Sequence, residues 1–416
     1  MTAEVAVINK SAVAIAADSA VTTELTDSSG RRHDKIFNTA NKVFALSKYA
    51  PVGIMVYNAT ELGGVPWETL IKEYRKDRGK KNFAHLEDYA SDLFKFLSGN
   101  KILFNEKHIK DVLLLILIRY FSSLLGNEKT SNRKARGIFE NKIGELENLE
   151  FADSFNSELL ELPNDYVAVV DEAAKFTFGL PAIRNLKTKY RRLAALAITK
   201  EFQLEGYSGV VITGFGEEEV FPKLIEYKTD LVIFDRVRKA KLQEFEPSHL
   251  TYGKVMSFAQ EDITRTILEG INPSYAKQIQ NSAIEYFSNL PSTIIDDIDE
   301  LEDDRKDHYK TRAFDAFVES IKDYFRKMNE ERKSKHTFQI EKAIQMMPFS
   351  ELAEIAEVFI RLTQVRRRLS PDSETVGGPI DVAVISKADG FVWIKRKYYF
   401  DKELNYSFMG NYLDKG

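Results

Sequence analysis

The residues best placed to do chemistry stand at the amino terminus of this chain. Thr2 comes shortly before two apolar, β-branched runs, at 5–8 and 13–18, which are separated by the polar residues 9–11. This pattern is typical of a buried β-hairpin, here with Asp18 at the end of its second strand. The first residues of most domains stay loose unless something holds them. We therefore expect this terminus to be either a buried structural element or part of a functional site.

The composition excludes several other kinds of site. The 416 residues include no cysteine, which rules out disulfides, thiolate nucleophiles and zinc–sulfur sites. The six histidines are scattered without the spacing of metal ligands, so we expect no metal and no cofactor. The 59 basic and 63 acidic residues give a net charge of −4, and this near balance makes nucleic acid an unexpected partner.

Three further patterns favour ordinary structure over function. The sequence GFGEEEVFP at 214–222 lacks the third glycine and the Lys-Ser/Thr of a phosphate loop and indicates a turn between strands. The acidic run 296–304 lacks the glycine and ligand spacing of a calcium loop, which favours a solvated helix start or an exposed negative face. The basic stretches 184–192 and 366–368 could bind an acidic partner, but such runs are usually solvated faces.

The hydropathy pattern gives no sign of a membrane segment. The first twenty residues carry acidic and polar groups where a signal peptide needs an apolar stretch. The strongest apolar run, 112–118, is far shorter than the ~20 residues that span a bilayer. We expect this run to lie in a buried helix, and we expect a cytoplasmic protein that does not bind membranes.

Strand-like segments at both ends of the chain predict an α+β fold whose sheets use both termini. The central part is mostly helical, with a block of strands inside it. The segment 165–173, DYVAVVDEA, is predicted to be a strand that opens this block. The expected parts are residues 2–80 as the first part of the core, 81–164 as a helical insertion, 165–270 as the central part of the core, 271–370 as a second helical insertion, and 371–416 as the strands that complete the core.

The amino-terminal residues resemble the start of a proteasome-type β subunit of the N-terminal-nucleophile (Ntn) hydrolase superfamily. That start has a Thr, two short strands with an Asp at the end of the second, and later a Lys followed by apolar residues. Here Thr2 and Asp18 are sixteen positions apart, as in the family, and Lys35 lies one position later than usual. The resemblance covers residues 2–76 and 371–396, with a looser match through 206–270.

The resemblance implies a four-layer αββα sandwich of two antiparallel sheets, with extra helical insertions. It also implies a threonine hydrolase that cleaves amide bonds, with a peptide or protein as substrate. Family relatives assemble into rings, so a homo-oligomer is expected. The insertions could dock an ATP-dependent unfoldase or another protein partner.

The family mechanism explains why these residue types are needed. A threonine hydroxyl is a weak nucleophile and requires a nearby base. Removal of Met1 would give Thr2 a free α-amino group, whose pKa near ~8 suits a general base. Lys35 would favour the alkoxide-like state of the hydroxyl, and Asp18 would hold the Lys35 ammonium in place. The oxyanion would bind a backbone N–H in the loop 56–60, around Asn58.

The sequence departs from the family pattern in two places. In the family, the loop that corresponds to 56–60 commonly contains a glycine, whereas this chain has Asn58 and no glycine there. Asn adopts the left-handed conformation more easily than most residues. At the carboxyl-terminal motif, Asp372 matches the accessory Asp with one inserted residue, and Val376 stands where the accessory Ser is expected. Ser373, Thr375 or Ser257 could supply a hydroxyl instead.

Two alternatives to a general peptidase are open, and these departures favour the first of them. The chain could be a proteasome-like scaffold or partner-binding protein without activity. It could also be an amidase or transpeptidase that acts on one specific substrate.

Overall fold

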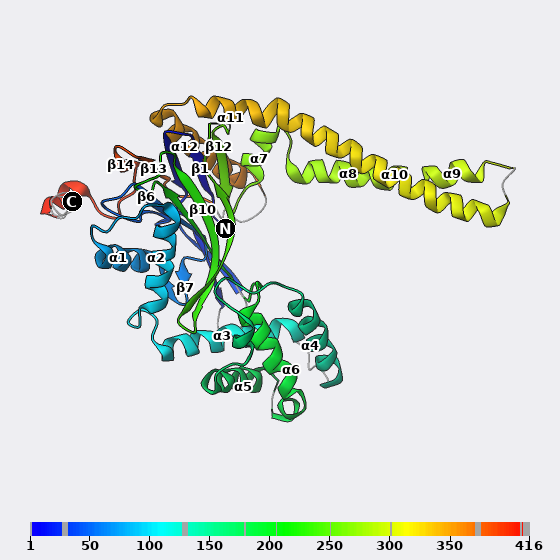
Figure 1. Ribbon diagram of the computed structural model, residues 1–416, viewed down its shortest axis with the longest axis horizontal. Coiled ribbons are helices and arrows are strands. Elements are labelled where there is room, and N and C mark those ends of the chain that lie inside the picture. Colours follow the sequence, from blue (N-terminus) through cyan, green and yellow to red (C-terminus); the bar gives the residue numbers. More distant parts are fainter. Residues whose placement is uncertain are drawn as a thin grey trace.

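Two antiparallel five-stranded sheets form the centre of the molecule. The computed structural model describes residues 2–26, 32–126, 132–178, 180–204, 206–249, 251–299, 302–370, 376–407 and 410. The first sheet has the order β12-β1-β2-β13-β14, and the second has the order β11-β10-β9-β6-β5 (Figure 1). Both ends of the chain contribute to the first sheet, which confirms the mixed α+β prediction.

The strand bounds follow the predicted apolar runs at both ends of the chain. The first sheet consists of β12 (Lys254–Phe258), β1 (Glu4–Ile8), β2 (Ala12–Ala17), β13 (Asp381–Ser386) and β14 (Gly390–Lys395). The second sheet consists of β11 (Arg236–Phe245), β10 (Lys223–Ile233), β9 (Ser208–Gly214), β6 (Val52–Asn58) and β5 (Val43–Ala45). Two short ribbons pair β3 (Val21–Thr26) with β4 (Arg32–Phe37) and β7 (Glu61–Leu62) with β8 (Val65–Pro66).

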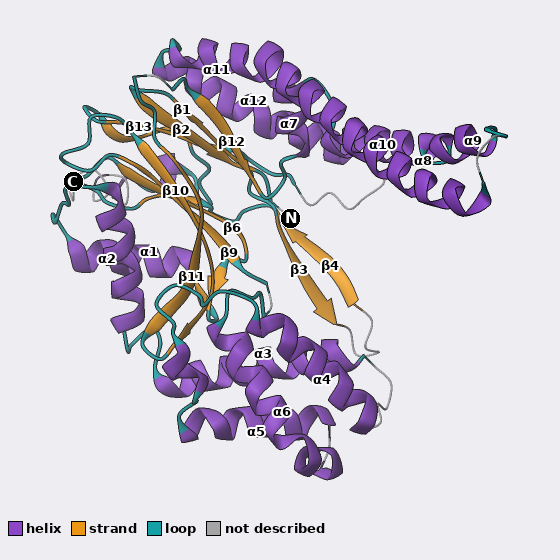
Figure 2. Ribbon diagram, turned by 45° about the vertical axis from the view of Figure 1, so that its right-hand side comes forward, coloured by secondary structure: helices purple, strands orange, loops and turns teal. Residues whose placement is uncertain are grey.

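The two sheets pack against each other around one apolar core, which is formed by alternate residues of the strands. Ala6 and Ile8 of β1 belong to this core together with Met55 of β6 and Val211 of β9. Helices cover the other face of each sheet (Figure 2). On the first sheet these are α7 (Asp262–Glu269), α11 (Phe338–Gln345) and α12 (Phe349–Arg368), and on the second they are α1 (Trp67–Arg78) and α2 (Leu86–Gly99).

The turn of the first hairpin ties the sheet to its helices. The side-chain oxygen of Asn9 accepts hydrogen bonds from the backbone N–H groups of Ser11 and Ala12, at 2.9 and 3.1 Å. Its amide nitrogen donates to the carbonyl oxygens of Ile344 and Met347, at 3.1 and 3.0 Å. Asn9 is buried, so these bonds satisfy a polar side chain that would otherwise be costly to bury.

A helical segment between β8 and β9 packs beside the second sheet. It contains α3 (Glu106–Leu125), α4 (Asn132–Glu147), the short helix η1 (Ser157–Leu160), α5 (Asn164–Phe178) and α6 (Leu180–Thr199). The predicted strand at 165–173 is wrong, because this segment lies in α5. The buried residues of α5 include Tyr166, Val169, Val170 and Ala173, whose spacing is that of a helix. The helical segment therefore continues to Thr199, beyond the expected boundary at 164.

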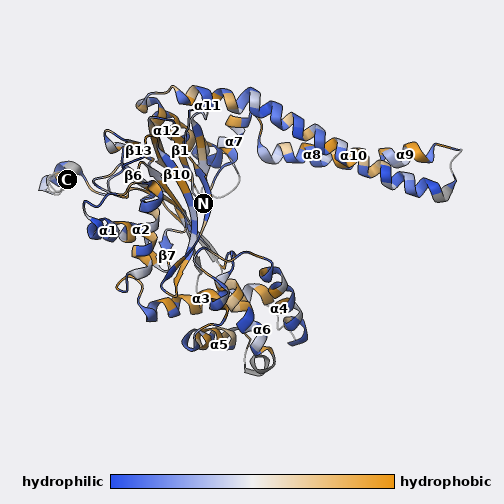
Figure 3. Cartoon of the chain, viewed as in Figure 1, coloured by the Kyte–Doolittle hydropathy of each residue, from blue (hydrophilic) through white to orange (hydrophobic). Residues whose placement is uncertain are grey.

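A long helical arm projects from the body of the molecule (Figures 1 and 2). It consists of α8 (Pro273–Phe287), α9 (Leu290–Asp296), α10 (Asp303–Arg332) and a π-helical turn, η2 (Lys333–Thr337), that leads into α11. Figure 3 shows α10 as a largely hydrophilic helix with separate apolar residues along it. The helix η3 (Lys402–Leu404) lies near the carboxyl end of the chain.

Candidate active site

The first hairpin places Thr2 and Asp18 at the same end of the first sheet. Glu4 pairs with Ala17 in the ladder, and the backbone of Asp18 donates to the Ala3 carbonyl oxygen at 3.1 Å. The Asp18 carboxylate accepts the Ala3 N–H at 3.0 Å. Thr2 is the next residue outward, and only 2% of it is exposed. The hairpin thus brings together Thr2 and Asp18 as the sequence predicted.

The lysine that pairs with Asp18 is Lys42, and not Lys35. The Lys42 ammonium donates to the Asp18 carboxylate at 2.6 Å and to the Ala20 carbonyl oxygen at 2.7 Å. Both side chains of this ion pair are buried. Lys35 lies on β4, opposite Thr23, and is exposed, with its ammonium 5.0 Å from the centre of the Phe37 ring. The predicted pairing of Lys35 with Asp18 is therefore wrong.

The sequence contains a signal for Lys42. Lys35-Ile36-Phe37 and Lys42-Val43-Phe44 share one pattern, in which a lysine precedes an apolar and an aromatic residue. The family spacing favours the first pattern. The β3–β4 ribbon, however, lengthens the chain between β2 and β5, so that the second pattern reaches the site. The Lys42 carbonyl oxygen accepts the Val56 N–H at 2.9 Å, which fixes Lys42 against β6.

Asp18 also holds the carboxyl-terminal part of the chain. Its carboxylate accepts the N–H groups of Ala20 at 3.1 Å and Gly377 at 3.0 Å. The neighbouring Ser19 hydroxyl donates to the Pro379 carbonyl oxygen at 2.6 Å. The predicted accessory residue Asp372, like Ser373 and Thr375, lies outside the described residues, while Val376 is buried in the core under α12.

The structure gives Asn58 the backbone conformation that the sequence allowed. Its φ is +62°, in the left-handed region, and its side chain is exposed. Within the predicted oxyanion segment, the Val56 N–H donates to Lys42 and the Ala59 N–H donates to the Tyr207 carbonyl oxygen at 3.1 Å. Those two N–H groups are engaged, so an oxyanion would require another donor of this segment.

Ser257, the other candidate for an accessory hydroxyl, lies on the wrong face of the first sheet. It is opposite Val5 in the β1–β12 ladder, and Val5 belongs to the core under α12. Its neighbours Met256 and Phe258 belong to the core between the sheets. Because successive side chains of a strand point to opposite faces, Ser257 points away from the face that carries Glu4.

Sequence reasoning missed a group of buried polar side chains between the two sheets. Tyr57 of β6 donates its hydroxyl hydrogen to Glu226 of β10, and Gln243 of β11 donates to the other Glu226 oxygen at 2.5 Å. The ring of Tyr57 stacks on Phe258, with 6.0 Å between ring centres. To reach β10, this ring crosses β9 at Gly209, where a Cβ would lie 1.9 Å from it. Only glycine fits at that position.

Glu4 completes this group. It lies opposite Phe258 in the β1–β12 ladder and is fully buried. Neither of its carboxylate oxygens forms a hydrogen bond within the described part of the chain. Burial raises the pKa of Glu4 well above its usual range, against the opposing effect of the Lys42 ammonium. Burial likewise lowers the pKa of Lys42, against the effect of Asp18.

We expect the Glu4→Gln substitution to change how stability depends on pH. Since the folded-state pKa of Glu4 is raised, the folded chain holds a proton that the unfolded chain loses above about pH 4.3, and stability falls as pH rises through this interval. Glutamine does not titrate. Urea unfolding from pH 4.5 to 7.5, with a tag that keeps Met1 in place, should show the variant gaining stability over the wild type by up to ~1.4 kcal/mol per pH unit. Parallel curves would contradict this expectation.

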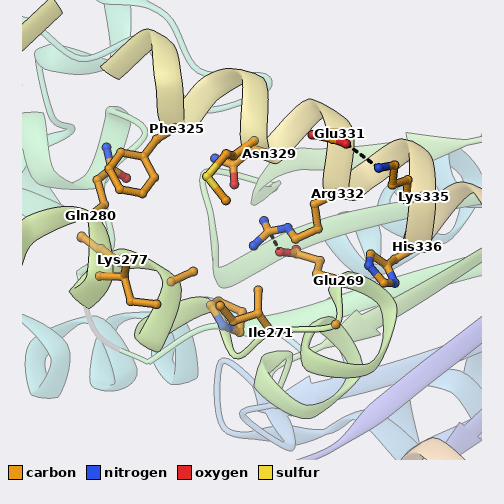
Figure 4. Close-up of a pocket in the computed structure, with 15 residues that line it drawn as sticks. Glu269, Ile271, Lys277, Gln280, Phe325, Asn329, Glu331, Arg332, Lys335 and His336 are labelled. Atoms are coloured by element: carbon orange, nitrogen blue, oxygen red, sulfur yellow. Dashed lines mark hydrogen bonds and ion pairs between the residues drawn. The ribbon is translucent and has the colours of Figure 1, made fainter. Parts of the chain in front are cut away.

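A separate pocket lies at the base of the arm, between α7, α8 and α10 (Figure 4). Glu269 accepts from Arg265 at 2.9 Å and from Arg332 at 2.8 Å. The first pair lies within α7, and the second connects α7 to the end of α10. None of the residues that line this pocket belongs to the group around Thr2.

The residues that the structure describes were also compared with the requirements of a membrane-spanning helix and of a metal site. None of their helices, α3 included, has the length and apolar character needed to cross a membrane. Those same residues contain no cluster of three or more acidic or histidine side chains that could hold a metal ion.

Comparisons with known proteins find a weak similarity in structure. No family model matches the chain. No curated protein matches it either. Among solved structures, it is similar to a Gly-1 mutant of Anbu from Hyphomicrobium sp. strain MC1, with 9% identity and a TM-score of 0.29. That match covers 100% of this chain and 96% of the other.

Proposed function

We propose that this chain is a threonine-type hydrolase with the four-layer fold of the Ntn hydrolases. It would cleave amide bonds, those of peptides first, through Thr2 after removal of Met1. The observation that supports this most is the buried Asp18–Lys42 ion pair, whose carboxylate also binds the backbone next to Thr2. Two sheets with a shared core and helices on their outer faces support the fold.

The proposed reaction has an acylation step and a hydrolysis step. The Thr2 hydroxyl oxygen attacks the carbonyl carbon while the free α-amine takes the hydroxyl proton. The C–N bond of the substrate breaks, and that proton passes to the leaving amine. Water then attacks the ester, with the α-amine again as base, and releases the acid and free Thr2. Lys42 would stabilise the negative charge that develops on the Thr2 oxygen.

Labelling by a β-lactone tests this proposal. We expect the intact mass of the purified protein to lack Met1, and we expect a β-lactone to acylate Thr2 in the wild type but not in Thr2→Ala. A retained Met1 would leave the Thr2 nitrogen as an amide, so the proposed base would not exist. Labelling that persists in Thr2→Ala would place the nucleophile elsewhere.

One observation favours the alternative of a scaffold without activity. Thr2 is 2% exposed, and its buried hydroxyl has no hydrogen-bond partner among the residues that the structure describes. A substrate therefore needs a local opening to reach it. An unlabelled Thr2 in a chain that has lost Met1 would support the scaffold.

A further inference from the structure

Glu4 and Thr2 lie on the same face of the first sheet. Ala3, Val5 and Val7 belong to the core under α12, whereas Ala6 and Ile8 belong to the core between the sheets. Side chains of a strand alternate between faces, so Glu4 points between the sheets, and Thr2 at the end of the strand shares its side. The two residues are about 7 Å apart along the chain, since a strand rises about 3.3 Å per residue.

The other buried carboxylates of this region each have a partner. Asp18 pairs with Lys42, and Asp381 pairs with Lys397. Glu226 accepts hydrogen bonds from Tyr57 and Gln243. Among the described residues of this group, Glu4 alone has two carboxylate oxygens without a hydrogen-bond donor. A buried carboxyl of this kind costs stability unless a donor or a cation reaches it.

The cations already present are bound elsewhere. The Lys42 ammonium uses hydrogen bonds to Asp18 and to the Ala20 carbonyl oxygen. Lys397, whose charge acts on Lys42, donates its backbone N–H to Asp381 at 2.8 Å and pairs with the same side chain. Removal of Met1, however, would create a new ammonium on Thr2, two residues from Glu4 and in a buried position.

We propose that Glu4 is a positioning residue that receives the α-ammonium of Thr2 once Met1 has been removed. This inference rests on the proposed function and adds to it a partner for the base. The Glu4 carboxylate would accept an N–H hydrogen bond from the ammonium and hold the nitrogen beside the Thr2 hydroxyl. The ammonium then loses one proton to water, so that an N–H bond breaks and an O–H bond forms on the water molecule. The neutral amine is then free to accept the proton of the Thr2 hydroxyl.

The surrounding charges set how the pair titrates. The groups whose charges act on Glu4 are Lys42 before β5, Asp18 after β2 and Glu226 on β10, and Glu4 in turn acts on Tyr57 of β6. Lys42 opposes protonation of a nearby amine, while Glu4, Asp18 and Glu226 favour it. Without Glu4, the balance therefore shifts toward a less basic amine.

Carbamylation of the α-amine by cyanate tests this inference without any need for activity. The chain is prepared without Met1, and the modification of Thr2 is followed by peptide mass spectrometry from pH 5 to 9. We expect the midpoint of the rate curve to fall by about one pH unit in Glu4→Gln and in Glu4→Leu. The matched control is Glu261→Gln, which removes an exposed acid that does not act on Glu4, and it should leave the midpoint unchanged.

A second measurement covers the case in which cyanate cannot reach the amine. Urea unfolding midpoints are compared at pH 7 for the wild type and for Glu4→Gln, each prepared with and without Met1. We expect removal of Met1 to raise the midpoint more in the wild type than in Glu4→Gln. Equal carbamylation midpoints, or equal effects of Met1 removal where cyanate does not react, would overturn the inference.

These outcomes are separate from those of the proposed function. If a β-lactone labels Thr2 but the pKa of the Thr2 amine does not depend on Glu4, the proposed role of Glu4 is refuted and the hydrolase proposal stands. If the pKa of the Thr2 amine depends on Glu4 but no β-lactone labels the chain, the ion pair is supported and the hydrolase proposal is refuted.

Discussion

Replacing Lys42 with methionine is expected to abolish β-lactone labelling of Thr2 and to destabilise the fold by about 3 kcal/mol. Methionine is similar in length but carries no charge, so the buried Asp18 carboxylate loses its cation. The three backbone N–H groups that Asp18 binds would keep this loss at the lower end of the range for broken buried ion pairs. Labelling rates and urea unfolding measure the two effects.

Lys35→Met is the matched control for this experiment. Lys35 is exposed, so its replacement is expected to change stability by less than ~0.5 kcal/mol and to leave labelling at the wild-type rate. If Lys35→Met lost labelling while Lys42→Met kept it, the assignment of the lysine to position 42 would be refuted.

The second large effect is expected for Asp18→Asn, which should cost about 3–5 kcal/mol in the free energy of unfolding. The Asp18 carboxylate accepts hydrogen bonds from the Lys42 ammonium and from three backbone N–H groups. An asparagine must turn its NH2 group toward one of these donors and leaves the Lys42 ammonium buried without a counter-ion. Labelling of Thr2 should fall with the loss of this geometry.

A surface ion pair supplies the control for Asp18. Asp153 pairs with Lys239 at 2.7 Å, and half of the Asp153 side chain is exposed. Asp153→Asn is therefore expected to cost less than about 1 kcal/mol. Urea unfolding at one pH measures both variants. If they lose similar amounts of the free energy of unfolding, the Asp18–Lys42 pair stabilises the fold no more than a surface ion pair does.

The first hairpin and Asp18 could be predicted because their determinants are local. Alternating β-branched residues around Asn9 define two strands and a turn, and Asp18 follows directly at the end of the second strand. Hydrogen bonds of the hairpin then bring Thr2 beside Asp18. Spacing alone was enough for this half of the site.

Lys42 could not be chosen from spacing, because that choice depends on how much chain the β3–β4 ribbon consumes. Two lysines precede the same apolar-aromatic pattern, and a count along the sequence favours Lys35. The structure places Lys35 within the ribbon and Lys42 directly before β5. Only the position of β5 in the second sheet distinguishes the two.

The polar group between the sheets depends entirely on long-range pairing. Glu4 meets Phe258 through the β1–β12 ladder, while Tyr57 reaches Glu226 by crossing Gly209. No short motif contains these residues. The one sign of this group in the sequence is Glu4, a charged residue directly before the apolar run VAVI at 5–8.

The mistaken strand at 165–173 has a related physical cause. Valine-rich stretches favour strands, yet Tyr166, Val169, Val170 and Ala173 also fall on one helical face. In the structure this face packs into the core shared with α3 and α6. Tertiary packing decided between two patterns that the segment supports equally.

The most direct test of the central claim is the site at which a peptide epoxyketone binds, since this probe can react with a hydroxyl and an amine of one residue. We expect mass spectrometry to find a single adduct on a peptide that begins at Thr2, with its α-amine no longer open to reductive methylation. The adduct should be absent from Lys42→Met and present in Lys35→Met. An adduct on another residue, or a peptide that still begins with Met1 and carries none, would contradict the claim that Thr2 is the nucleophile.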